Sequence, residues 1–209
     1  AGSLTSSIQS SLLVWNSNYF KNLDVTLDNL DSSLNALIVS DEMSLGEIAF
    51  SGVAITGYAN DNSVFAGFSY DGIKGITNAG EFYITGDLSR DEDDLLCIDA
   101  RPLSSFLRFG DQQWNIDESL ISWKKGMATI DGFRIYNGTQ SFSLDGGISA
   151  SSADTLAVDI SNVDLSVINY FTSENLDIRG ITSGTAVISS PIKGGMHALA
   201  YLNCDSLMV

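Results

Sequence analysis

Hydrophobic and polar residues alternate with a period of two along most of this chain. Leu23, Val25 and Leu27 alternate with polar neighbours, and residues 156–160 repeat the pattern. Successive side chains of a β-strand point to opposite faces, so this spacing predicts strands with one apolar and one polar face. Shorter runs rich in β-branched and aromatic residues predict further strands at 53–56, 64–70, 82–84 and 185–188. The pattern therefore predicts an all-β protein.

Turn-forming residues separate these runs. Asn, Asp and Gly tolerate the positive φ angles that tight turns require, so their clusters indicate chain reversals. The clusters are Asn60-Asp61-Asn62, Asp71-Gly72, Asn78-Ala79-Gly80, Asp131-Gly132, Asn137-Gly138 and Asp145-Gly146-Gly147. Strand and turn alternate about every ten residues, which is typical of a meander, a sandwich or a solenoid.

Two stretches interrupt the alternation and predict short helices. Residues 102–109 begin with Pro102, a residue favoured in the first helical turn, and residues 164–171 begin with the capping residue Asp164. The first stretch ends near the middle of the chain. We therefore expect two β-rich halves, residues 1–110 and 111–209, which could also form one continuous curled sheet.

Composition excludes several classes of protein. The 209 residues suffice for one large domain or two small ones, and 44% of them are hydrophobic, which excludes a disordered chain. The formal charge of −16 repels phosphate backbones, so nucleic acid is not an expected partner. The sequence begins without Met at Ala1 and ends on the apolar Leu207-Met208-Val209. These ends lead us to expect a segment of a longer protein.

Residues suited to catalysis or metal binding are few. The chain has one histidine, His197, in an apolar-flanked stretch that favours a strand surface. Cys97 and Cys204 are too far apart in sequence to indicate a zinc site or a disulfide framework. The acidic run 91–94 lacks the glycine and ligand spacing of known calcium loops, so a solvated loop is the preferred interpretation. We expect no catalytic residue, no metal and no cofactor.

Carbohydrate chemistry stays open as an alternative. Trp15, Trp114 and Trp123 could form a platform on which sugar rings stack, although aromatic residues along strands are more often core or cross-strand pairs. A catalytic pair of carboxylates cannot be selected from the many Asp and Glu residues. A cell-surface β-sandwich that binds a glycan or a protein partner is therefore the second hypothesis.

The second half of the chain carries a more specific pattern. The residues concerned are 114–117, 126–149, 154–165 and 176–188, the last of which is punctuated by glycines. Their sequence resembles the repeating strands of the TamB and AsmA-like translocation and assembly module proteins. The residue pattern is most similar to that of homologues of the Bacteroides type. The likeness extends over about the second half of the chain and is diffuse over the first.

The resemblance implies a long curled sheet that forms an open trough in the periplasm. The parent protein would be anchored in the inner membrane outside this segment, and would transport phospholipid or assist outer-membrane protein assembly together with the outer-membrane assembly machinery. This chain would be a middle segment without enzymatic activity. Alternation places six residues on one face, which we predict to form a groove for acyl chains: Phe142, Leu144, Ile148, Leu156, Val158 and Ile160. The same residues could instead form the core of an ordinary β-sandwich.

Overall fold

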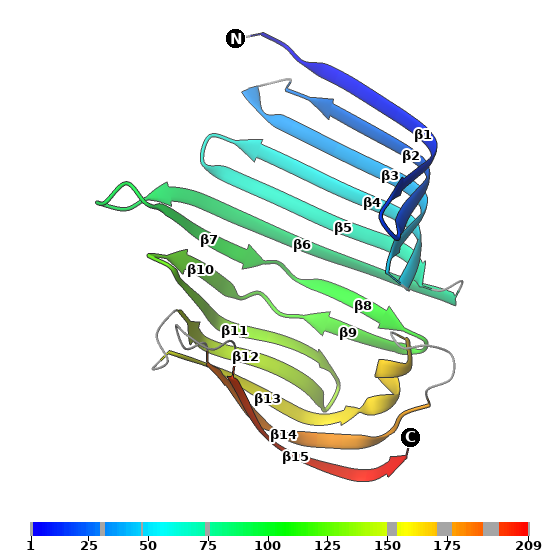
Figure 1. Ribbon diagram of the computed structural model, residues 1–209, viewed down its shortest axis with the longest axis vertical. Helices are drawn as coiled ribbons and strands as arrows, with labels where there is room; N and C mark the ends of the chain where they lie inside the picture. The colour runs from blue at the N-terminus through cyan, green and yellow to red at the C-terminus, as the bar shows by residue number, and fades with distance from the viewer. Residues whose placement is uncertain are drawn as a thin grey trace. The chain divides into compact units, whose positions relative to one another are not determined.

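The computed structural model describes residues 2–29, 32–46, 48–73, 76–149, 154–170, 177–189 and 197–208. These residues fold almost wholly into β-strands, which confirms the all-β prediction (Figure 1). The strands form one 15-stranded sheet in the order β1-β2-β3-β4-β5-β6-β7-β10-β11-β12-β13-β14-β15, with β8 beside β6 and β9, and β9 also beside β11. The described strands therefore do not form the two packed sheets of a sandwich.

The chain divides into two compact units. Unit 1 comprises Ala1–Asp87 and Ser105–Gln113, and unit 2 comprises Leu88–Ser104 and Trp114–Val209. Unit 1 holds β1 (Thr5–Trp15), β2 (Asn18–Asp28), β3 (Leu34–Leu45), β4 (Ile48–Asn60), β5 (Ser63–Ile73), most of β6 (Ile76–Arg90) and β8 (Ser105–Phe109). Unit 2 holds β7 (Leu96–Pro102), β10 (Leu120–Lys124), β11 (Met127–Asn137), β12 (Gln140–Ile148), β13 (Thr155–Asp164), β14 (Arg179–Ser189) and β15 (His197–Met208). Strand β9 (Gln112–Ile116) belongs to both units.

Cross-strand register sorts the side chains of unit 1 onto two faces. One apolar residue from each of six strands stands in a single row of consecutive partners: Ile8, Val25, Ile38, Ile55, Phe68 and Phe82. We call the face that carries this row the apolar face of unit 1. The alternate positions, which include Asp24, Thr56 and Glu81, form the polar face of unit 1.

A line of interrupted pairing crosses β1 to β5. Ser10 pairs with Leu23 and Leu12 with Lys21, but no pair forms between them, and the pairing of β3, β4 and β5 is interrupted at the corresponding positions. The residues of this fold line are Ser11, Asn22, Asp41, Gly52 and Asp71. Asn22 and Gly52 have positive φ angles of 49° and 59°, in the left-handed region. Such residues bend a strand, and Figure 1 shows β1 to β4 changing direction near one end.

The fold line brings the ends of these strands against the apolar face of unit 1. The Phe50 ring, beyond the line, lies 5.7 Å from the ring of Phe68 and 5.1 Å from that of Tyr70. Val53 is fully buried and Ile73 is 2% exposed. Burial of each such side chain stabilises the fold by about 1.5–3 kcal/mol. The core of unit 1 therefore lies inside this bend.

Four of the predicted turns are in fact positions within strands. The chain does reverse at 60–62 and at 137–138, as predicted, but the other clusters lie inside β5, β6, β11 and β12: Asp71-Gly72, Asn78-Ala79-Gly80, Asp131-Gly132 and Asp145-Gly146-Gly147. At Asp131-Gly132 the register shifts by one residue, which is a β-bulge, and Gly132 has a φ of 70°. Turns and bulges both need positive φ, so they attract the same residue types.

The helix predicted over residues 102–109 is wrong. Pro102 is the last residue of β7, and Ser105–Phe109 form β8. Strand β8 pairs with β6, and the backbone N–H of Tyr83 donates a hydrogen bond to Ser105 Oγ at 3.0 Å. Pairing with a strand distant in sequence therefore decided the structure of this stretch against its local propensity.

The second predicted helix is present as a short 3-10 helix, η2 (Leu165–Tyr170). Asp164 Oδ1 accepts a hydrogen bond from the backbone N–H of Ser166 at 2.9 Å, as expected of a capping residue. Asn169 then joins η2 to the start of β14, because its side chain exchanges two 2.9 Å hydrogen bonds with the backbone of Ile178. Phe171, the last residue of that prediction, lies outside the described residues.

The fold line makes a prediction about Gly52. Gly52→Ala should lower the free energy of unfolding by about 1–2 kcal/mol, because an L-residue is strained at this positive φ. A Cβ there would also collide with the Asp71 carboxylate. Gly57→Ala on the same strand is the control, because its Cβ would meet only Ala36 Cβ, at 3.5 Å. Urea denaturation measures both variants, and equal stability of the two would contradict the role of Gly52.

Candidate apolar binding faces

The register of unit 2 places the six predicted groove residues on one face. Phe142 pairs with Ile160, and Leu144 pairs with Val158. Leu156 pairs with Gly146, and Ile148 stands two positions further along β12. Residues two apart in a strand share a face, so all six belong to what we call the apolar face of unit 2. Their role in binding stays a prediction.

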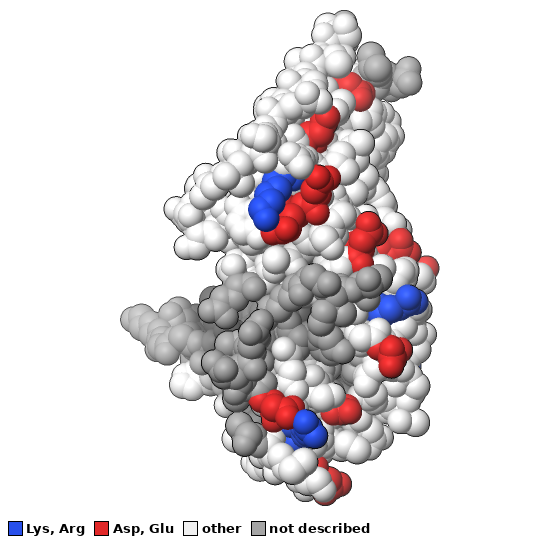
Figure 2. All heavy atoms as spheres, turned by 90° about the vertical axis from the view of Figure 1, so that its right-hand side faces the viewer, with Lys and Arg blue, Asp and Glu red and all other residues white. Residues whose placement is uncertain are grey.

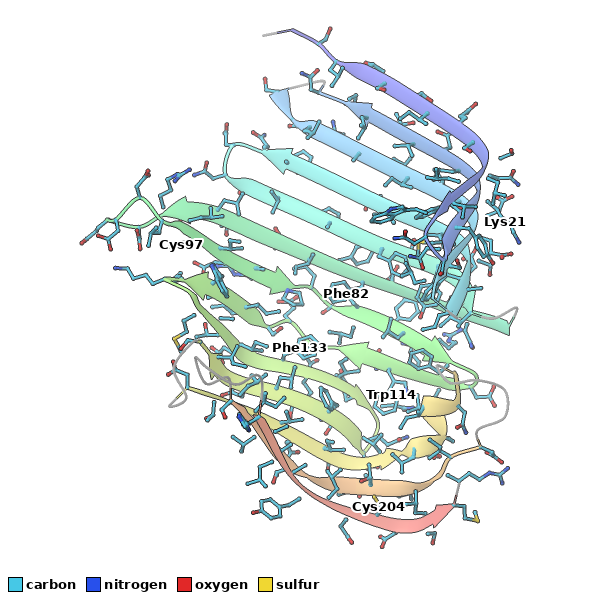
Figure 3. All side chains as sticks on the ribbon, in the orientation of Figure 1. Lys21, Phe82, Cys97, Trp114, Phe133 and Cys204 are labelled. Carbon is cyan, nitrogen blue, oxygen red and sulfur yellow. The ribbon has the colours of Figure 1, made fainter. Side chains whose placement is uncertain are left out.

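Sequence reasoning missed further residues of this face. Phe133 pairs with Leu144, and Ile135 pairs with Phe142 (Figure 3, where Phe133 is labelled). Ile116 on β9 pairs with Ile135, which extends the same row. The alternation of Phe133 and Ile135 was a usable signal, but the Asp131-Gly132 bulge before them resembled a turn. Nothing in the local sequence indicated that Ile116 joins β11, because that pairing is decided by the tertiary fold.

The apolar face of unit 2 is only partly buried. Val158, at its centre, is 7% exposed, whereas the other five predicted residues are partly accessible. The inner faces of a β-sandwich would bury such side chains against a second sheet. Gly184, which stands between Ile160 and Leu202 in the register, adds no side chain to the face. The geometry is that of an apolar surface with access from solvent.

The apolar face of unit 1 has a similar character, although the sequence pattern alone did not indicate a site there. Its row of large residues includes Phe82, labelled in Figure 3. Beside that row, Ala36, Gly57 and Ala66 are consecutive partners on β3, β4 and β5. These three side chains are small, so they form a strip across the strands that projects less from the sheet than the neighbouring row of Ile and Phe side chains. Such a strip offers extended apolar contact to a narrow hydrocarbon chain.

The opposite faces are polar. In unit 2, Ser143, Asp159 and Thr185 form one row on the face opposite Val158, with Arg134 and Tyr201 at its ends. Across the surface shown in Figure 2, acidic side chains are more numerous than basic ones. Unit 2 therefore combines an apolar face with a polar one that carries Ser, Asp and Thr side chains.

Several acidic groups are stabilised as anions by specific partners. The Tyr19 hydroxyl donates to Glu42 and Lys21 Nζ lies 2.9 Å from Glu42 Oε1, and these two hydrogen bonds lower the pKa of the Glu42 carboxyl. In unit 2, Ser122 Oγ donates to Asp99 at 2.5 Å, and Lys124 Nζ lies 2.9 Å from the same carboxylate, so the pKa of Asp99 is also lowered. These basic side chains are thus engaged with carboxylates.

The other candidate residues do not assemble a chemical site. His197 begins β15 at an exposed position, and Cys97 and Cys204 form no disulfide. Within the ranges that the structure describes, no group of three or more His, Cys, Asp or Glu side chains is arranged to hold a metal ion. No helix among these residues is long and apolar enough to cross a membrane.

The acidic run 91–94 is a loop stabilised by internal contacts. Asp91 Oδ1 accepts hydrogen bonds from the backbone N–H groups of Asp93 and Leu95, at 2.9 and 3.0 Å. Lys125 Nζ lies 3.0 Å from Asp93 Oδ2 and 3.7 Å from Asp91 Oδ2. The backbone hydrogen bond from Leu95 is the main cause of the lowered pKa of Asp91. The run agrees with the predicted solvated loop.

The three tryptophans do not share one environment. Trp114 is 5% exposed and so offers no ring face to a sugar, whereas Trp15 is 72% exposed and Trp123 46% exposed. An open depression of about 370 Å³ lies elsewhere, where the fold line interrupts the pairing of β1 and β2. The residues that line it include Gln9, Asn22, Leu23 and Asp24.

Comparison with protein-family models, with curated proteins and with solved structures finds no match for this chain. The resemblance to the TamB and AsmA-like proteins therefore stays a prediction from the sequence.

The Glu42 cluster makes a prediction about pH. Because the folded pKa of Glu42 is lowered, its contribution to stability is present above the unfolded pKa of about 4.3 and is lost as pH falls through the folded value. Tyr19→Phe removes the largest cause of the shift, so it should raise the pKa of Glu42 toward its ordinary value. Carboxyl NMR titration measures this change. Tyr58→Phe is the control, and an unchanged Glu42 pKa in Tyr19→Phe would contradict the assignment.

Proposed function

We propose that this chain is a non-enzymatic segment of a TamB/AsmA-like periplasmic protein whose apolar faces hold lipid acyl chains. The parent protein would be anchored in the inner membrane, and its work would be phospholipid transport or outer-membrane protein assembly. The observation that carries the proposal is the partly exposed apolar face in each unit. Soluble proteins rarely leave large contiguous apolar surfaces open unless these bind something.

The chemistry of the two faces supports an acyl chain as the occupant. In unit 1 the apolar row continues through six consecutive strands, so it runs across the strand direction as a continuous hydrocarbon surface. Polar groups that would recognise a specific small molecule are absent from this row. Binding there would depend on area of apolar contact rather than on hydrogen bonds, which suits chains of variable length.

In this mechanism the protein supplies a surface and no reaction. Acyl chains lie along the apolar rows while their headgroups stay in water. Because successive binding positions along the row differ little in free energy, a chain can move between them by diffusion. Net direction then comes from the membranes at either end or from other parts of the parent protein.

Val158→Asp tests the proposal in unit 2. A carboxylate in the middle of the apolar face should reduce uptake of a fluorescent fatty-acid probe about tenfold or more, because the bound chain would desolvate the charge. Ala157→Asp is the matched control, since Ala157 is exposed on the opposite face of the same strand. Native mass spectrometry of protein purified without detergent reports co-purified phospholipid.

A second pair of variants keeps the proposal testable if Val158→Asp does not fold. Ile55→Asp changes the apolar face of unit 1, and Ala54→Asp changes the opposite face of the same strand. Circular dichroism and thermal melting establish which variants fold. Wild-type protein without co-purified lipid or probe uptake would refute the proposal, as would equal uptake by folded members of each pair.

A further inference from the structure

The polar face of unit 1 carries four aromatic residues on adjacent strands. Tyr58 on β4 pairs with Phe65 on β5. Tyr83 follows on β6, and Phe106 on β8 pairs with Glu81, two residues before Tyr83. The register places all four on the face opposite the row of Ile55 and Phe68. We call Tyr58, Phe65, Tyr83 and Phe106 the aromatic stripe.

The rings form an extended surface rather than a buried cluster. Phe65 and Tyr83 have ring centroids 6.0 Å apart and an interplanar angle of 19°. A Cβ on Gly67 would lie 2.9 Å from the Tyr83 ring, so this ring lies over the Gly67 backbone. Tyr58 is 40% exposed, and the other three are partly exposed. From the spacing of strands and residues, the stripe is about 20 Å long between its outer Cα atoms.

Polar side chains border the stripe. Tyr83 Oη donates to Glu81 Oε2 at 2.9 Å, which raises the pKa of the Tyr83 phenol. Asn60 Nδ2 donates to Tyr58 Oη at 3.2 Å. Planar carboxylate and amide groups thus stand next to aromatic rings.

Sheet stability alone does not account for this arrangement. A cross-strand aromatic pair involves only two adjacent strands. Here the aromatic residues continue over four neighbouring strands, and the same face carries polar residues such as Thr56, Ser69 and Glu81 together with Leu37 and Val39. An aromatic surface with polar neighbours is the combination that binds sugars, because pyranose C–H groups stack on rings while hydroxyls bond to carboxylates and amides.

We propose that the aromatic stripe binds a neutral polysaccharide chain. The charge of the same face selects the class of polymer, since Asp24, Asp28 and Glu81 all lie on it and disfavour an anionic chain. The stripe is long enough for several sugar rings in a row. This activity is separate from acyl-chain binding, because it uses the opposite face of unit 1.

Affinity electrophoresis tests the proposal with four neutral polymers, namely mixed-linkage β-glucan, xylan, galactomannan and dextran. At least one should retard the wild-type chain, and anionic polygalacturonate should not. The double variant Phe65→Leu/Tyr83→Leu should bind about tenfold more weakly, because two stacking rings are lost. Tyr83→Phe keeps the ring and should retain most of the affinity. Thr26→Ala, on the same face away from the stripe, is the matched control.

The single variant Tyr58→Leu, at the most exposed ring, serves if the double variant does not fold. Failure of all four neutral polymers to bind the wild-type chain overturns the proposal. Unchanged affinity in the folded stripe variants also overturns it. Uptake of the fluorescent fatty-acid probe should be the same in wild-type and stripe variants. Absence of that uptake from the wild-type chain would refute the acyl-chain function and would leave polysaccharide binding standing.

Discussion

Antiparallel register is the constraint on which both proposed binding surfaces depend. Side chains alternate between faces, so a slip of one residue at any strand interface would exchange the apolar and polar sets beyond it. The row from Ile8 to Phe82 requires the register to hold over five consecutive interfaces. The bulge at Asp131-Gly132 preserves the arrangement in unit 2, because Ile130 and Phe133 on either side of it pair with Gly146 and Leu144 of the same face.

Positive φ angles occur inside strands of both units. Asn22 and Gly52 have them on β2 and β4, and Gly132, Gly146 and Asn162 have them on β11, β12 and β13. Asn and Gly both tolerate such angles. In unit 1 the bends enclose a small core around Val53 and Ile73, and the remainder of the apolar face stays outside it. The core and the proposed binding surface therefore lie on different parts of one face.

The acidic character of the chain complements its open apolar surfaces. A formal charge of −16 opposes self-association, which a partly exposed hydrophobic face would otherwise promote. Basic side chains such as Lys21 and Lys124 are held against carboxylates. A bound lipid would therefore be retained by its hydrocarbon part, and a bound polysaccharide by stacking and neutral hydrogen bonds.

The sequence by itself determined the strand class and the six residues on the apolar face of unit 2, since period-two alternation is a local property of adjacent residues. It also located the capping of η2 by Asp164, which acts within two residues. It could not distinguish a bulge from a turn at Asp131-Gly132, because both accept the positive φ that Gly132 adopts. Only the tertiary structure decided that 105–109 is a strand, that Ile116 joins the apolar row, and that Tyr58, Phe65, Tyr83 and Phe106 form a stripe. These features depend on partners distant in sequence, and no local pattern carries that information.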